Sequence, residues 1–377
     1  MRILTLNYEF PPVGGGGGRF CRDLCGELAR LGHEIRVQTV HFRGLPRLET
    51  SCGYAVYRNR SLRRRPHTCS VPEMAAFLAA NLLPSFRHAL TWKPGVIHAH
   101  FAVPTGVLGW LLHRATGIPY IVSTQLGDVP GAIPHQTDRL FRWVKPFTRP
   151  IWKDAAVVTA PSEHIRLLAE RAYDVPVKVL PNGVDLSKIR ANPATNVPPR
   201  LVFAGRFNSQ KNLAFLLDVL SGVTDLDWRL EMVGDGPEMD LLRGRANDHG
   251  FEERVRFHGW QPQEVVESIV GRSDILVMPS LSEGLPIVGL ISLASGLAVV
   301  GSDVGGIAEL VEEGRNGFLC RAGDAGAFEN ALRECLQPGG RLGRMKEESR
   351  RLASRYDIAS VARSFEECLF EATITRM

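Results

Sequence analysis

Short runs of apolar and β-branched residues alternate with helix-length segments along the chain. Before residue 182 the runs are RILTL, EIRVQTV, GVIHAH, PYIVS, AAVVTA and VKVLP. This alternation is typical of βαβ units in a parallel sheet. A second series, RLVFAG, WRLEMVG, VRFHGW, DILVMPS and LAVVGSD, follows the Pro-rich segment ANPATNVPPR. The pattern therefore predicts an α/β fold of two doubly wound domains, with the join between about Asn182 and Arg200.

Composition adds limits to this picture. The chain has 377 residues, of which 44% are hydrophobic, and this is enough to fill two cores. The formal charge of +5 is mild for this length, so it indicates contact with anions without requiring nucleic acid. The 7 cysteines are scattered and form no CxxC pair, which favours reduced thiols over a disulfide framework or a zinc site.

The N-terminal sequence MRILTLNYEF shows no secretory signal, because its apolar run is short and meets Glu9. The longest apolar stretches, 74–90 and 101–112, are interrupted or too short to match the ~20 apolar residues of a spanning helix. We therefore expect a cytoplasmic protein that is not an integral membrane protein.

The run PPVGGGGGRF follows the first predicted strand and opens a predicted helix. That helix is indicated by apolar residues at helical spacing: Phe20, Leu24, Leu28 and Leu31. Glycines such as Gly15 and Gly16 lack side chains, so backbone N–H groups can face an anion at the helix N-terminus. The structural alternative is a flexible turn, and we favour phosphate binding. The spacing is not GxGxxG with a later acidic residue, which argues against a nicotinamide dehydrogenase.

Two further loops carry candidate chemistry in the second half of the chain. AGRFNSQKN places Arg206 and Lys211 just after a predicted strand, where open α/β sheets bind ligands, so both cations could converge on one diphosphate. SEGLPIVGLISLASG follows another strand, and N–H groups near Gly284 and Leu285 could face a phosphate, with Pro286 in the first helical turn. Glu283 either stabilises the helix N-terminus or accepts a hydrogen bond from a sugar hydroxyl.

These segments together resemble a known family. PPVGGGGGRF, VIHAHF, VLPNGVD, FAGRFNSQKN, VGDGPE, VRFHGW, PSLSEGLPIVGLISLASGLAVVGSDVGGIAELV and NGFL are similar to retaining glycosyltransferases of family 4, such as glycogen synthases and mannosyltransferases. The resemblance implies the GT-B architecture, with two Rossmann-like domains facing across a cleft. It implies an acceptor-side domain over residues 1–182, a nucleotide-sugar domain over 183–355, and a C-terminal helix over 356–377 that crosses back to the first domain.

The resemblance also implies roles for individual residues. It places Gly15 and Gly16 near the donor diphosphate, and Arg206 and Lys211 on that diphosphate. Glu283 corresponds to the first acidic residue of the family's E-x7-E motif, which contacts the donor sugar. Backbone contacts beside it correspond to Gly284, Leu285 and Pro286.

Two positions depart from the family's pattern. The second Glu of the motif, which holds the ribose hydroxyls, falls on Ile291, and an apolar side chain cannot accept those bonds. The His of a T-x-H-G-x-D pattern falls on Gln125, which cannot carry a positive charge, while Asp128 is retained. His100, at a strand end, is a further candidate for the cleft.

The expected function is transfer of a sugar from a nucleotide-diphosphate donor to a hydroxyl acceptor, with retention and without a metal or other cofactor. The acceptor could be a glycan, a lipid-linked molecule or a small molecule. The segment from Arg58 to Arg65 carries five arginines and could contact anionic lipid. The departures at Ile291 and Gln125 leave a non-catalytic glycosyltransferase-like subunit as an alternative, and a phosphorylase or epimerase is disfavoured because no pyridoxal-lysine motif is apparent.

Overall fold

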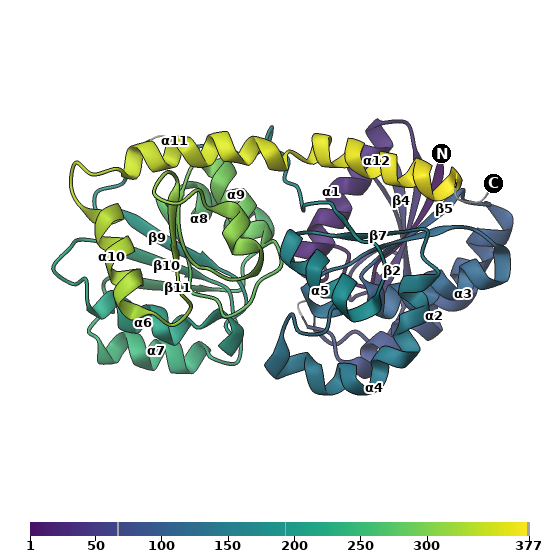
Figure 1. Cartoon of the computed structure of the whole chain (residues 1–377), viewed down its shortest axis with the longest axis horizontal. Coiled ribbons are helices and arrows are strands. Elements are labelled where there is room, and N and C mark those ends of the chain that lie inside the picture. The colour runs from purple at the N-terminus through teal and green to yellow at the C-terminus, as the bar shows by residue number, and fades with distance from the viewer. Residues whose placement is uncertain (66–67, 193, 375–377) are drawn as a thin grey trace. The chain divides into compact units, whose positions relative to one another are not determined.

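The computed structural model describes residues 1–65, 68–192 and 194–374. The chain forms two compact units (Figure 1). Unit 1 consists of Met1–Gly183 together with Ile358–Met377, and unit 2 consists of Val184–Asp357. The helix expected to cross back forms α12 (Ile358–Ile374) and belongs to unit 1, while residues 375–377 lie outside the described part of the chain.

Unit 1 is built on one sheet whose order, for the described residues, is β3-β4-β2-β1-β5-β6-β7-β8. The strands are β1 (Arg2–Leu6), β2 (Glu34–His41), β3 (Leu48–Ser51), β4 (Tyr54–Arg60), β5 (Val96–His100), β6 (Tyr120–Ser123), β7 (Val157–Ala160) and β8 (Lys178–Val179). All neighbours pair in parallel except β3 and β4. The central strands are buried on both faces, as their near-continuous apolar sequences predict.

The antiparallel edge strand β3 was not predicted, because LETS is short and polar. β3 and β4 are joined through Cys52 and Gly53, whose φ angles are +49° and +85°. Positive φ at both central residues is the geometry of a tight hairpin turn whose twist matches that of the strands. The first sheet is therefore mixed at this edge rather than purely parallel.

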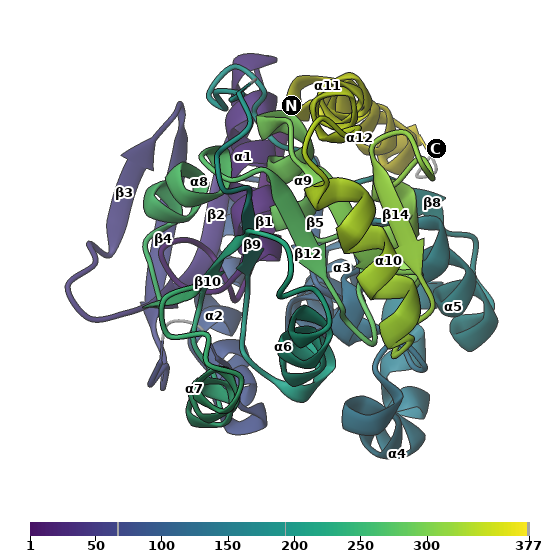
Figure 2. The same ribbon diagram turned by 90° about the vertical axis from the view of Figure 1, so that its left-hand side faces the viewer.

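Helices cover both faces of this sheet. They are α1 (Gly16–Arg30), α2 (Val71–Thr91), α3 (Val107–Thr116), α4 (Pro134–Lys153), α5 (Glu163–Tyr173) and α12. Side chains of α2, α3, α4 and α5 pack with those of β1, β5, β6 and β7 in one core. On the other face, α12 runs beside α1 (Figures 1 and 2). The ring centroid of Phe365 on α12 lies 4.7 Å from that of His98 on β5. The C-terminal helix thus completes the core of the first unit.

Unit 2 is a parallel sheet whose order, among the residues described, is β11-β10-β9-β12-β13-β14. The strands are β9 (Arg200–Ala204), β10 (Arg229–Val233), β11 (Val255–Gly259), β12 (Ile275–Met278), β13 (Ala298–Ser302) and β14 (Gly317–Cys320). The helices are α6 (Leu213–Ser221), α7 (Met239–Asp248), α8 (Gln263–Gly271), α9 (Ile287–Ser295), α10 (Ala325–Leu336) and α11 (Leu342–Ala353). The doubly wound sheets predicted from the sequence are confirmed in both units.

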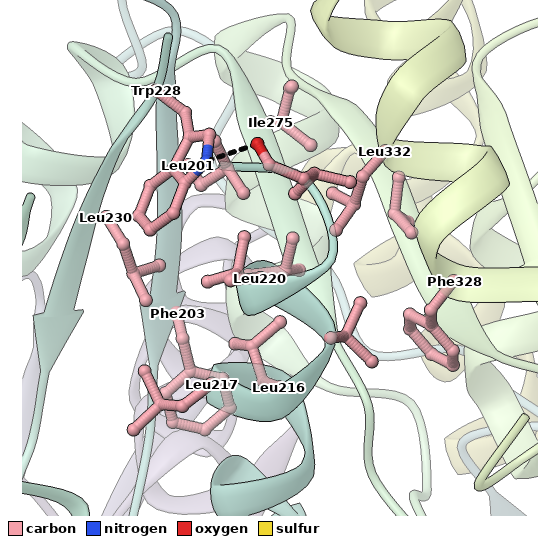
Figure 3. Packing of buried hydrophobic residues seen from close by; sticks show 14 of the residues in the cluster. Leu201, Phe203, Leu216, Leu217, Leu220, Trp228, Leu230, Ile275, Phe328 and Leu332 are labelled. Atoms are coloured by element: carbon pink, nitrogen blue, oxygen red, sulfur yellow. Dashed lines mark hydrogen bonds between the residues drawn. The ribbon is translucent and has the colours of Figure 1, made fainter. Parts of the chain in front are cut away.

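Figure 3 shows how the core of unit 2 is assembled. Leucines of α6 and Phe328 and Leu332 of α10 meet strand residues such as Leu201 and Leu230, and all are almost completely buried. The large Trp228 fits because its indole Nε1 donates a hydrogen bond to the carbonyl of Val223 at 3.1 Å. This core holds the carboxyl ends of the strands at one edge, which is where the candidate loops begin.

No helix among the described residues combines the length and the apolar character needed to cross a membrane.

Candidate functional site

The candidate residues of unit 2 lie on loops that leave the carboxyl ends of neighbouring strands. Arg206 comes two residues after β9, and Lys211 ends a short helical turn, Ser209–Lys211, in the same loop. Glu283 lies on the loop after β12, which pairs with β9. Because parallel strands end at the same edge, the sheet brings together residues that are distant in sequence.

Lys211 and Glu283 form the centre of this arrangement. The Nζ atom of Lys211 lies 2.5 Å from Oε1 of Glu283, although the residues are 72 positions apart. The Ser280 hydroxyl donates to the same oxygen at 2.9 Å. Glu283 is only 5% exposed, so its carboxylate is held by charge-assisted hydrogen bonds in a largely desolvated position.

Further hydrogen bonds join the two loops. The Gln210 Nε2 donates to the carbonyl of Ser282 at 2.8 Å, and the backbone N–H of Leu281 donates to the carbonyl of Gln210 at 2.8 Å. Arg206, in the same loop, is exposed. The loops therefore hold Lys211 and Glu283 against each other.

A glycine pair after β13 supports the Glu283 loop and was not singled out from the sequence. Gly305 has a φ of +52°, and a Cβ atom there would lie 1.9 Å from the Glu283 carbonyl oxygen. A Cβ on Gly306 would lie 1.7 Å from the carbonyl oxygen of Gly284. Only glycine permits this backbone approach. The signal in the sequence was the pair GG just after the strand LAVVGSD.

The other predicted residues of this loop lead into α9. Leu285 is buried, and α9 begins at Ile287, one residue after Pro286, so Pro286 precedes the first turn rather than lying within it. Ile291 lies in the middle of α9 and is 4% exposed. Its side chain is thus part of the apolar packing of unit 2.

In unit 1 the glycine run also follows a strand and begins a helix, α1. Gly15 precedes the helix and Gly16 is its first residue. A Cβ on Gly17 would lie 3.0 Å from the ring of Phe101 and 3.7 Å from Cγ of Gln125. The structure therefore brings the glycine loop and Gln125 together, as required for a shared site.

Phe101 lies next to these residues, and its backbone conformation is unusual. Its φ of +79° is rare for a residue with a bulky side chain and stores strain. The ring packs against Tyr8 with centroids 4.9 Å apart. Such strain concentrates at functional sites. No pattern in the sequence indicated it.

Asp128 is the last residue of the short helical turn Leu126–Asp128, which Gln125 precedes. Its Oδ2 accepts a hydrogen bond from the N–H of Gln125 at 2.9 Å, and Oδ1 accepts one from the N–H of Val103 at 3.2 Å. Burial raises the pKa of this carboxyl to about 7, although these N–H donors act in the opposite direction. Asp128 therefore organises the loop and changes protonation state near neutral pH.

His100 ends β5 and is completely buried beside Phe101, with ring centroids 4.8 Å apart. Neither ring nitrogen makes a hydrogen bond of ordinary geometry among the described residues. Burial lowers the pKa of His100 to about 3, with the backbone of Gly17 acting in the opposite direction. A neutral imidazole is thus held behind the glycine loop.

A family described as Glycosyltransferase Family 4 matches residues 14–188, and one described as Glycosyl transferases group 1 matches residues 198–338. The chain is 30% identical over 344 residues to the putative teichuronic acid biosynthesis glycosyltransferase TuaC of Bacillus subtilis, covering 82% of this chain and 83% of TuaC.

The chain belongs to glycosyltransferase family 4. It is thus an enzyme of the GT-B type that transfers a sugar from a nucleotide donor.

Solved structures share the fold of this glycosyltransferase. Sucrose-phosphate synthase from Thermosynechococcus elongatus superposes with a TM-score of 0.84 at 19% identity, covering 97% of this chain and 98% of that one. Anabaena Alr3699/HepE in complex with UDP and glucose gives a TM-score of 0.77 at 19% identity, covering 98% and 99%. The GT-B fold expected from the sequence is confirmed.

The arginine-rich segment of the glycosyltransferase is only partly exposed. Arg58 is buried on β4, with Nη1 2.6 Å from Oε2 of Glu49, and Arg63 is buried with Nη2 3.7 Å from Oε1 of Glu9. The exposed arginines of this segment are Arg60, Arg64 and Arg65. The expectation of a basic surface was therefore wrong for Arg58 and Arg63, because burial and carboxylate partners hold their side chains inside unit 1.

Proposed function

We propose that this glycosyltransferase retains the configuration of the transferred sugar and works without a metal, moving the sugar from a nucleoside-diphosphate donor to a hydroxyl acceptor. The observation that carries the proposal is the contact of Lys211 with Glu283 at the carboxyl edge of the second sheet. A cation for the diphosphate and a carboxylate for the sugar hydroxyls lie side by side there. Gly284 and Leu285 continue the loop toward α9.

Arg206 and Lys211 would stabilise the negative charge that develops on the leaving diphosphate. The N–H groups at the start of α9 would add to this effect, because helix N-termini attract anions. Lys211 is held in place by Glu283 before any donor binds, so little reorganisation would accompany the reaction. Preorganised donors of this kind act more strongly than the same groups in water.

Glu283 would bind the sugar rather than attack it. Its Oε1 accepts hydrogen bonds from Lys211 and Ser280, and we assign Oε2 to a hydroxyl of the donor sugar. The acceptor hydroxyl would approach the same face of the sugar that the diphosphate leaves. An oxygen of the departing diphosphate would take the acceptor proton, so the new bond forms as the old one breaks and configuration is retained.

The Asp225–Leu226–Asp227 sequence has the DxD pattern of metal-dependent transferases, and its surroundings favour a different role. The carboxylate of Asp225 forms a two-point contact with Arg333, at 2.8 Å and 2.9 Å. The segment also precedes β10, so it lies at the end of the strand remote from the candidate loops. We infer that this segment is a structural turn.

In unit 1 we assign Gln125 and the glycine loop around Gly15 and Gly16 to the donor side of the reaction. Gln125 can donate or accept a hydrogen bond with a sugar hydroxyl. Asp128 and His100 would act as positioning residues, because both are buried behind these groups. The neutral His100 would keep the rear of the site free of positive charge.

The donor nucleotide follows from the departure at position 291. A buried Ile291 cannot accept hydrogen bonds from ribose hydroxyls. A donor with fewer ribose hydroxyls, such as a dTDP-sugar, would therefore lose less binding free energy at this position. UDP is the competing candidate, since HepE was solved with UDP. The name of TuaC favours an acceptor of the kind used in teichuronic acid biosynthesis.

Thermal stabilisation by UDP, GDP, ADP, CDP and dTDP tests the proposal. Ligand at a hundred times its dissociation constant should add about 2.7 kcal/mol to the stability of the unit that binds it. We expect a clear shift with one nucleotide, reduced in a Lys211→Met variant, and consumption of the matching nucleotide-sugar without added metal. If no diphosphate shifts the transition, the chain lacks a donor site, and a non-catalytic role replaces this proposal.

A further inference from the structure

Helix α4 presents two large aromatic side chains to solvent. Trp143 is 77% exposed and Phe147 is 82% exposed. Among the described residues, the next most exposed tryptophan is Trp260, whose side chain is 45% exposed. Single exposed apolar residues are common on protein surfaces, whereas adjoining exposed aromatics are unusual and mark contact surfaces.

The two aromatics lie on one side of the helix because they are four residues apart. α4 packs into unit 1 through other side chains, which are buried: Phe141, Thr148, Ile151 and Trp152. α4 is therefore anchored by buried side chains and exposes an apolar strip, Trp143 and Phe147, to solvent.

Basic residues border this strip. The sequence of α4 carries five basic residues and one acidic residue, Asp138, which gives a net charge of +4. Arg142, Arg149 and Lys153 are exposed and, at helical spacing, form a stripe roughly a third of a turn around α4 from the aromatic strip. Lys153 also lies 4.0 Å from Asp174, in an exposed ion pair of little strength.

This combination matches an anionic lipid bilayer. Tryptophan and phenylalanine partition into the boundary between headgroups and acyl chains, and arginine and lysine bind the anionic headgroups. A second copy of the chain is a poor partner for this strip, because two helices of the same positive charge would repel each other. A purely anionic glycan would leave the aromatic pair without an apolar environment.

We propose that α4 docks this glycosyltransferase on anionic membrane surfaces through Trp143 and Phe147, with Arg142 and Arg149 on the headgroups. The docking surface differs from the arginine-rich segment at residues 58–65, where Arg58 and Arg63 are buried. α4 begins at Pro134, six residues after Asp128, so the docked helix continues directly from the loop that carries Gln125. An acceptor held in the bilayer would thus lie near the candidate site of unit 1.

Vesicle sedimentation with the full-length protein tests this docking and needs no sugar transfer, so its outcome is independent of the proposed reaction. Vesicles of phosphatidylcholine alone are compared with vesicles that also contain phosphatidylglycerol. We expect the wild-type protein to bind only the anionic vesicles, and added salt to weaken this binding. Trp143→Ala with Phe147→Ala should lower the partition coefficient at least about tenfold.

Charge variants and matched controls separate this surface from others. Arg142→Gln and Arg149→Gln should each lower binding about fivefold. Trp143→Phe should retain most of the binding, since it keeps an aromatic ring. Trp260→Ala in unit 2 and the pair Arg64→Gln with Arg65→Gln should leave it unchanged. Circular dichroism of every variant should match the wild type, because the substituted side chains are exposed.

Three results would overturn the proposal. One is the absence of wild-type binding to anionic vesicles, and another is equal binding by the double aromatic variant. The third is a wild-type dimer without vesicles that the double aromatic variant dissociates in sedimentation velocity, which would assign the strip to a second copy of the chain.

Discussion

Lys346 on α11 and Asp274, just before β12, form a buried ion pair in which Nζ lies 2.8 Å from Oδ1. The side chains are 2% and 0% exposed. The same carboxylate accepts hydrogen bonds from the backbone N–H groups of Asn196 and Arg200. Asp274 therefore ties the segment before β9 and the helix α11 to the centre of unit 2.

Replacing Lys346 with Met should strongly destabilise unit 2. The substitution leaves a buried carboxylate without its cation, which typically costs about 3 to 5 kcal/mol. Urea unfolding of the full chain measures the loss as a lower midpoint. Arg355→Gln is the matched control, because Arg355 pairs with Glu312 on the surface and should have almost no effect. Equal midpoints for the two variants would contradict this role of the buried pair.

Lys211→Met and Glu283→Gln should each lower kcat for sugar transfer by about 10² to 10³-fold. The first substitution removes a charge assigned to the leaving diphosphate, and the second weakens the hold on the sugar. Because the two groups contact each other, the double variant should lose less than the product of the single losses. Initial rates of donor consumption measure this, with Lys188→Met as an exposed control. Fully multiplicative losses would show that the two side chains act separately.

The glycines of the run GGGGG should differ sharply in their tolerance of a methyl group. A Cβ on Gly18 would lie 1.6 Å from the carbonyl oxygen of Glu9, whereas nothing lies within 4 Å of a Cβ on Gly15. Gly18→Ala should therefore cost about 1 to 3 kcal/mol or more. Gly15→Ala should cost less than about 1 kcal/mol. Thermal unfolding of both variants measures this difference. Equal losses of stability would show that close packing at Gly18 is not what requires glycine in the run.

Asp128 should make unit 1 less stable as pH rises. Its pKa is raised by burial from an ordinary value of 3.8 to about 7, so the folded state holds the proton more tightly than the unfolded state. The stabilisation is complete below pH 4, declines between pH 4 and 7, and is absent above pH 7, and it amounts to about 4 kcal/mol. Asp128→Asn should remove this pH dependence, as measured by urea unfolding at a series of pH values. An unchanged profile would refute the raised pKa.

His100 should have the opposite effect on the pH dependence of the stability of unit 1. Burial lowers its pKa from 6.5 to about 3, so the folded state resists protonation. Its contribution to stability is present above pH 6.5 and is lost as pH falls toward 3. The wild-type profile should therefore be flatter than that of Asp128→Asn, which exposes the acid sensitivity of His100. His100→Leu in the Asp128→Asn background should remove that sensitivity.

The fold was largely predictable from the sequence, because each buried parallel strand is a compact apolar run followed by a helical pattern. β3 was not, since four residues of LETS carry little apolar signal, and β14 was hidden in the motif NGFL. The candidate residues Lys211 and Glu283 were identified, but not their contact, because it depends on strand order. Their assigned roles stay predictions.

Other features of the site depend on three-dimensional packing and leave no local pattern. The positive φ of Phe101 and the close approach of Gly305 to Glu283 arise only when separate loops meet. The prediction of a basic surface at the arginine-rich segment was wrong for Arg58 for the same reason. Charge alone does not reveal that Arg58 pairs with a carboxylate inside unit 1. The aromatic strip on α4 likewise required knowledge of which helix face is buried.

The inclusion of α12 in unit 1 has a consequence for biosynthesis. All residues of unit 2 leave the ribosome before α12, although most of unit 1 is made earlier. Phe365 cannot cover His98 until α12 has been made, so one face of the first sheet stays open while unit 2 is synthesised. The unit whose first residues are made earliest is thus the last to finish folding, and a chain stalled before α12 would hold a folded second unit and an incomplete first.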